Sequence, residues 1–221
     1  MNDTAALRKR TICIPSYTLG EELFNAISHG IGALLSIAAL VLMIVKAHGA
    51  LSVTTVSLFG SSMVILYTIS CIYHALSPRL KGKKVLRVLD HCNVFLLVLG
   101  TYIPVSLIGV GGALGWVLFG IVCFFAVLGI VLTAVDLERF KVPAVICHLA
   151  SGWSILIGVP GLLRTMGKAG LTVLILGGIM YSIGAVLYGV GAKKKYRHCV
   201  FHIFCLLGSF CHFWCVFQYL L

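Results

Sequence analysis

Five side chains in three short stretches of this sequence could together build a metal site. Ser70 and His74 are four residues apart, Asp90 opens the next apolar stretch, and His198 and His202 are again four residues apart. Three histidines and a carboxylate are typical ligands of transition metals, and zinc is the first to consider. Two histidines one helical turn apart can bind the same ion from one helix. The residues therefore predict a zinc site, provided that the elements carrying them meet.

Those elements are expected to be membrane-spanning helices. Of the 221 residues 60% are hydrophobic and only 10% are charged, whereas soluble chains carry about a quarter charged residues. The apolar stretches of this sequence are continuous rather than alternating with polar residues, which disfavours a β-barrel. The predicted fold is an all-α integral membrane protein, with a short N-terminal segment (1–22) and a seven-helix transmembrane domain (23–221). The seven stretches long enough to cross about 30 Å of hydrocarbon are 23–46, 52–77, 88–110, 113–135, 142–163, 169–191 and 198–220.

The basic residues predict the orientation of these helices. All but three of the 17 Lys and Arg residues lie in the N-terminal segment or in every second loop after it, the exceptions being Lys46, Arg164 and Lys168. By the positive-inside rule, the N-terminus is cytoplasmic and the C-terminus lies outside, in a multi-pass protein of the cell membrane. The expected partners are then membrane lipids and not nucleic acid.

This orientation places all five candidate residues in the cytoplasmic leaflet. Ser70 and His74 lie near the inner end of the second span, Asp90 opens the third, and His198 and His202 open the seventh. Charged and ionisable groups at membrane depth are costly and mark functional sites. The charge pattern and the site residues are independent, and both indicate the same face.

A zinc ion at this site would favour hydrolysis of a carbonyl compound. With His74, His198 and His202 as ligands, a coordination position stays open, as in catalytic zinc sites. Such an ion activates water and polarises a carbonyl. Asp90 could then take the proton and Ser70 could help to hold the oxyanion. In a bilayer leaflet the natural substrate is a lipid amide or ester, so the sequence predicts a zinc-dependent intramembrane hydrolase.

Other interpretations of the same residues remain open. Asp90 could cap a helix, Ser70 could bond its own backbone, and the histidines could pair or relay protons. The chain would then be a non-enzymatic membrane protein, either a sensor of lipid state or a pore-forming protein. Ion conduction is less favoured because the outer leaflet holds few polar residues.

Additional polar residues in the same leaflet have no assigned role. Glu22, Asn25 and His29 share one helical stripe, and an interhelical hydrogen-bond network is their expected role. His91 and His148 could orient a metal ligand or simply pack, and His212 is expected to be structural. The nine cysteines show no paired spacing and are expected to be small buried hydrophobes.

Four groups of segments carry a resemblance to a known family. They are Glu21–Gly30, Ser70–His74, Leu89–His91 with Gly100–Pro104, and His198–His202 with Gly208–Phe213. With its seven spans, the chain resembles the hemolysin III family, the short bacterial branch of the progestin and adipoQ receptor superfamily.

The resemblance implies a function as well as a fold. It implies a seven-helix fold with a cytoplasmic N-terminus and a zinc ion bound by His74, His198 and His202, with Ser70 and Asp90 beside it. The superfamily is linked to alkaline ceramidases, which implies ceramidase-like hydrolysis of a lipid amide. The adiponectin receptors of the superfamily carry a long cytoplasmic N-terminal region, whereas about twenty residues precede the first span here, so no hormone-receptor role is expected. The family name implies cytolysis, which no amphipathic or pore-like feature of the sequence supports. Neither the lipid nor the oligomeric state is predicted.

Overall fold

The computed structural model describes residues 14–191 and 195–221, and all regular structure in these ranges is helical. The expected all-α class is therefore confirmed. Residues 1–13 of the N-terminal segment lie outside the described residues, as do Lys193 and Lys194 of the last basic loop. The helices are α1 (Leu19–Lys46), α2 (Gly49–Ala75), α3 (Gly82–Pro104), α4 (Gly112–Asp136), α5 (Lys141–Trp153), α6 (Val159–Gly191) and α7 (Arg197–Tyr219). A π-helical turn, η1 (Val105–Val110), follows α3, and a 3-10 turn, η2 (Ser154–Gly158), joins α5 to α6.

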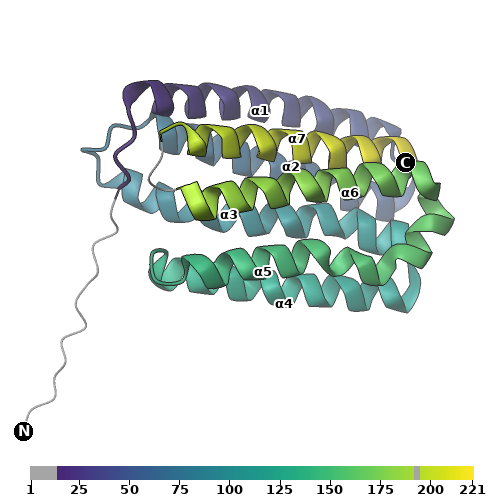
Figure 1. Cartoon of the computed structure of the whole chain (residues 1–221). Helices are drawn as coiled ribbons and strands as arrows, with labels where there is room; N and C mark the ends of the chain where they lie inside the picture. Colours follow the sequence, from purple (N-terminus) through teal and green to yellow (C-terminus); the bar gives the residue numbers. More distant parts are fainter. Residues whose placement is uncertain (1–13, 192–194) are drawn as a thin grey trace, which may run out of the picture.

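Six helical stretches of the described chain are long and apolar enough to cross a membrane. One of them, Lys141–Gly189, runs through α5, η2 and α6 for 49 residues. A straight helix of that length would measure about 74 Å, more than twice the thickness of the hydrocarbon core. The stretch is not straight, because Gly167 has a φ of 64° and breaks the helix. Figure 1 shows that α5 and the part of α6 after this bend run in opposite directions.

The bundle turns apolar side chains outward as well as inward. Phe124 and Val135 of α4, for example, are 64% and 71% exposed, which suits contact with lipid tails. Inside, α2 packs between α1 and α3, and α7 packs against α1 and α6. Phe59, Met63 and Leu118 belong to the main apolar core between them.

The chain direction gathers four helix ends at one end of the bundle. Figure 1 shows the starts of α1, α3 and α7 together with the end of α2, at the left of the view. α1 begins there with a capping box, in which Thr18 and Glu21 satisfy each other's backbone amides. These four ends carry the candidate site residues, so the topology alone brings them to one region.

Candidate metal centre

The three histidines predicted as metal ligands meet between α2 and α7. His74 lies one residue before the end of α2, and His198 and His202 lie in the first two turns of α7. One ring nitrogen of each residue lies within 4.8 Å of the other two. The Nε2 atoms of His198 and His202 are 3.0 Å apart. The structure thus places three imidazoles where they could hold one metal ion.

The hydrogen-bonding state of these rings fits a bound cation. Nε2 of His74 and Nδ1 of His202 are buried and have no hydrogen-bond partner among the described residues. A buried polar atom left without a partner costs about 1–3 kcal/mol. A neutral imidazole keeps one nitrogen lone pair as an acceptor, and the two Nε2 atoms of α7 share at most one hydrogen. A metal ion that accepts a lone pair from each Nε2 would satisfy His74 and the two facing atoms of α7, whereas Nδ1 of His202 would still have no partner among the described residues.

His74 is supported from the side away from the other histidines. Its Nδ1 donates to Oε2 of Glu22 on α1 at 2.6 Å. The second carboxylate oxygen, Oε1, accepts from Nζ of Lys83 on α3 at 2.6 Å. Lys83 is fully buried and donates also to the backbone oxygen of Leu76 at 2.7 Å. A carboxylate behind a histidine ligand is the usual way to fix the ring and its tautomer.

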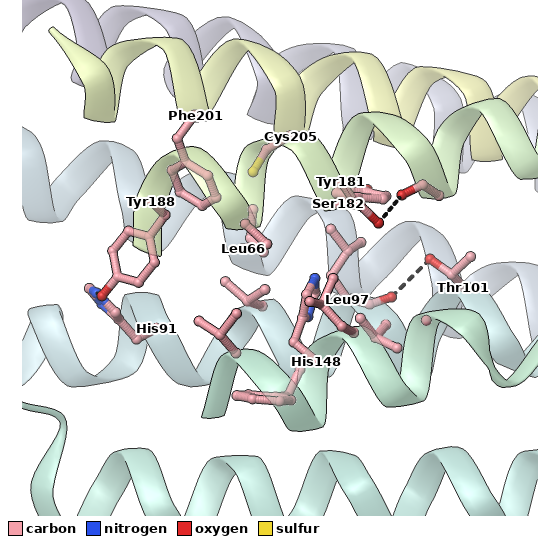
Figure 2. Close-up of a pocket in the computed structure, with 18 of the residues that line it drawn as sticks. Leu66, His91, Leu97, Thr101, His148, Tyr181, Ser182, Tyr188, Phe201 and Cys205 are labelled. Carbon is pink, nitrogen blue, oxygen red and sulfur yellow. Dashed lines mark hydrogen bonds between the residues drawn. The ribbon is translucent and has the colours of Figure 1, made fainter. Parts of the chain in front are cut away.

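A cavity of about 150 Å³ adjoins the histidines, and four of the five predicted site residues line it. These four are Ser70, Asp90, His198 and His202. Figure 2 shows His91 and Tyr188 at one end of the cavity and Thr101 at the other. Between them the walls are mostly apolar. A molecule bound with its polar group at the histidines would therefore have its apolar part in a hydrophobic compartment.

Asp90 does not cap a helix. α3 begins at Gly82, so Asp90 lies more than two turns inside it. Its side chain is largely buried, and Oδ2 is 3.9 Å from Nδ1 of His91. The capping interpretation of Asp90 is therefore wrong, because the polar turns that precede it extend the helix beyond the apolar stretch.

Ser70 does not bond its own backbone either. Its side chain is 1% exposed, and its Oγ has no hydrogen-bond partner in the part of the chain that the structure describes. A buried hydroxyl beside a cavity, with its hydrogen and lone pairs unused, is available to a ligand. The structure thus removes the two local alternatives for Ser70 and Asp90.

The polar stripe of α1 behaves differently from the expectation. Glu22 alone joins an interhelical network, since the amide of Asn25 and both ring nitrogens of His29 have no hydrogen-bond partner within the described ranges. The ring of His29 stacks on that of His202, with centroids 3.7 Å apart. His29 therefore packs directly against a candidate ligand.

The remaining histidines of the cavity fall into two classes. His91 is satisfied, because it donates to the backbone oxygen of Arg87 and accepts from the hydroxyl of Tyr188. His148 faces the cavity (Figure 2), and its Nδ1 has no hydrogen-bond partner among the described residues. His212, expected to be structural, also lines the cavity; its Nε2 donates to the backbone oxygen of Leu174, and its Nδ1 has no partner among the described residues.

Two neighbours of the histidines could not be found from the sequence. Tyr17, just before α1, stacks on His198 with ring centroids 5.1 Å apart and an interplanar angle of 16°. Burial raises the pKa of its phenol, so Tyr17 is a neutral ring over the site. Lys83 looks like one more topology-setting charge in the sequence. Only the stripe that includes Glu22 signalled that α1 takes part.

Comparison with known proteins assigns the chain to a family. The family described as "Haemolysin-III related" matches residues 17–213, nearly the whole chain. The chain belongs to the haemolysin III family. It is 38% identical over 204 residues to "Hemolysin-3" of Bacillus cereus, which covers 91% of this chain and 92% of that protein. It is also 38% identical over 206 residues to "Hemolysin-3 homolog" of Bacillus subtilis (strain 168), covering 92% and 96%.

A more distant relative extends the comparison beyond bacteria. The chain is 25% identical over 158 residues to "Adiponectin receptor protein" of Drosophila melanogaster, covering 57% of this chain and 33% of that protein. The resemblance inferred from the sequence is therefore confirmed. As a member of the haemolysin III family with six stretches able to span a membrane, the chain is a multi-pass membrane protein.

Proposed function

We propose that this haemolysin III family member is a zinc-dependent hydrolase that cleaves a lipid amide or ester within the membrane. The observation that carries the proposal is the cluster of three imidazoles beside a cavity that Asp90 and Ser70 also line. Three histidine ligands with an open position are typical of catalytic zinc. A purely structural cluster would have no need of a buried carboxylate and a free hydroxyl next to it.

The proposal gives each residue a separate task. His74, His198 and His202 would hold the ion, whose chemistry is to polarise a carbonyl and supply a hydrolytic nucleophile at neutral pH. Asp90 accepts the proton that the attacking water loses, as a general base. The hydroxyl of Ser70 donates to the carbonyl oxygen as negative charge develops there. Two observations support these roles: Ser70 Oγ has no hydrogen-bond partner among the described residues, and Asp90 lies inside α3 rather than at its N-terminus.

The cavity supports a lipid as the substrate. Its walls beyond the histidines are built from apolar side chains such as Leu66, Leu97 and Phe201 (Figure 2). A hydrocarbon chain loses no hydrogen bonds in such a compartment, whereas a polar substrate would. Membrane lipids are therefore the proposed partners, with the amide or ester carbonyl at the histidines.

The proposed topology is seven crossings with the histidines on the cytoplasmic side. The start of α1 and the end of α7 lie at opposite ends of the bundle (Figure 1), which requires an odd number of passes. Six stretches give seven passes when the 49-residue one reverses at Gly167. Basic residues at the end that carries the histidines, including Arg79, Lys81 and Arg139, support a cytoplasmic location of that end by the positive-inside rule.

The test compares two aspartate variants. We expect the purified wild type to contain about one zinc per chain and to release fatty acid from a ceramide or an acyl ester in detergent. Asp90→Asn should keep the zinc and lose about 10²- to 10⁴-fold in rate, the usual contribution of a general base. Asp136→Asn is the matched control, because Asp136 accepts from the backbone of Arg139 at the end of α4, away from the cavity lining.

A wild type without zinc, or an Asp90→Asn variant that hydrolyses at the wild-type rate, would contradict this function. The second candidate is cytolysis, because two close relatives carry the name hemolysin. Lysis of erythrocytes by purified protein, unchanged in Asp90→Asn, would favour that candidate over hydrolysis.

A further inference from the structure

A fully buried lysine lies beside the candidate metal centre. Lys83 has no exposed surface, and its ammonium donates to Glu22 Oε1 and to the backbone oxygen of Leu76. It also lies 5.2 Å from the ring centre of Tyr73, where the aromatic face attracts a cation. Removing an ammonium from water is costly unless it is paired and hydrogen-bonded. A topology signal would need no such burial, because charge at the membrane surface serves that purpose.

The contacts of Lys83 lead directly to a candidate ligand. Glu22 uses one oxygen for Lys83 and the other for Nδ1 of His74, each at 2.6 Å. Since a carboxylate has only acceptors, Nδ1 must carry the ring hydrogen. The lone pair of His74 then lies on Nε2, the nitrogen without a partner.

We propose that Glu22 and Lys83 are positioning residues of the metal centre. Lys83 holds the carboxylate of Glu22 in place, and Glu22 fixes the ring orientation and the tautomer of His74. The inference rests on the proposed metal site and deepens it, since it adds one residue from α1 and one from α3 to a site whose ligands come from α2 and α7.

The first measurement is zinc affinity, by competition with a chromophoric chelator in detergent. Loss of an outer partner of a histidine ligand typically weakens metal binding by 10- to 100-fold. We expect losses of that size for Glu22→Gln, whose amide oxygen can accept from only one of Lys83 and His74, and for Lys83→Met. Lys46→Met is the matched control. Lys46 also donates to a backbone oxygen, that of Phe217, and lies over an aromatic ring, but at the other end of the bundle. Its zinc affinity should equal that of the wild type.

The double variant Glu22→Gln/Lys83→Met distinguishes positioning from general support of the fold. It removes both charges and keeps the side-chain volume, so it avoids an unpaired buried charge. If Lys83 acts only through Glu22, the double variant should bind zinc no more weakly than the weaker single variant. The unfolding temperature of the zinc-free proteins reports structural damage separately.

The outcomes separate this inference from the proposed function. Zinc binding by the wild type together with unchanged affinity in Lys83→Met, or with losses that multiply in the double variant, would overturn the positioning role alone. A folded wild type that takes up no zinc would overturn the metal site itself, and the positioning role with it.

Discussion

The two ends of the bundle treat polar side chains in opposite ways. At the histidine end, defined by His74, His198 and His202, ring nitrogens of the three residues lie close together, and Nε2 of His74 and Nδ1 of His202 have no partner among the described residues. At the opposite end, where α1 and α7 finish, Lys46 donates to a backbone oxygen of α7. Thr165 likewise donates to the backbone oxygen of Gly109. Both ends contain polar groups within a membrane protein. Among the described residues, the buried polar atoms without a partner gather at the histidine end, and Ser106 Oγ in η1 is the exception at the opposite end.

This difference distinguishes polar groups that stabilise the fold from polar groups that could bind a ligand. A polar group that is hydrogen-bonded to a helix carbonyl stabilises packing and needs no further partner. Buried polar atoms that remain unsatisfied are destabilising on their own, and persist where a ligand completes them. In the far part of the cavity, His212 is satisfied at Nε2, which donates to the backbone oxygen of Leu174, whereas its Nδ1 has no partner among the described residues.

The largest expected effect is on zinc content, when a candidate ligand is removed. His202→Ala should remove the zinc almost completely, because two imidazoles in a membrane leaflet form a poor site. His212→Ala should keep about one zinc per chain, because its ring is held by a backbone carbonyl and lies away from the three ligands. Elemental analysis of both purified variants checks this. Equal zinc contents in the two variants would show that the ends do not differ in this way.

A smaller effect is expected from a glycine at the opposite end. A Cβ at Gly115 of α4 would collide with the backbone oxygen of Ser106 in η1, and a backbone atom cannot move aside as a side chain can. Gly115→Ala should lower the free energy of unfolding by about 1–3 kcal/mol, as overpacking does. Gly120→Ala, five residues on with open space around it, is the control. Unfolding in mixed micelles measures both.

Measuring the zinc content of the Gly115→Ala variant shows whether the effect stays at the opposite end. Gly115→Ala should keep its zinc, because the clash is confined to the end without the histidines. Loss of zinc in a folded Gly115→Ala protein would mean that the two ends are coupled rather than independent.

The smallest expected effect concerns the region between the ends. The hydroxyl of Tyr67 contacts Ser209 Oγ at 2.5 Å and donates to the backbone oxygen of Cys205, and Tyr181 contacts the same Ser209. Tyr67→Phe should cost about 0.5–1.5 kcal/mol of stability, the value of a typical hydrogen bond, and leave zinc binding unchanged. Thermal unfolding and zinc content together check it. A loss of zinc would place this satisfied cluster within the functional site.

Much of the architecture could be predicted because long apolar stretches have few alternatives in a membrane. The boundaries were less predictable where polar turns continue a helix. The third stretch was expected from residue 88, but α3 begins at Gly82. Its first two turns carry Lys83 and Arg87, which hydropathy excludes although both side chains are buried. That extension is also why Asp90 lies inside the helix rather than at its start.

The candidate site could be predicted where it depends on spacing and chain direction. The pair on α7 and the single histidine on α2 meet because both follow from helical periodicity and alternating topology. Contacts that depend on how each helix is rotated about its axis were not predictable. The bond between Glu22 and His74 is of this kind, as are the burial of Lys83 and the stacking of Tyr17 on His198.

The contacts of Lys83 have a consequence for the order in which the protein matures. They tie α1, α2 and α3 together, all of which leave the ribosome before the rest of the chain. His74 can therefore adopt its final orientation while α7, with His198 and His202, has yet to be synthesised. A nascent chain that ends before α7 therefore contains His74 but lacks the other two candidate ligands. If the proposed centre binds zinc, the ion can be bound only after the last helix has been made, so zinc-loaded protein would consist of fully synthesised chains.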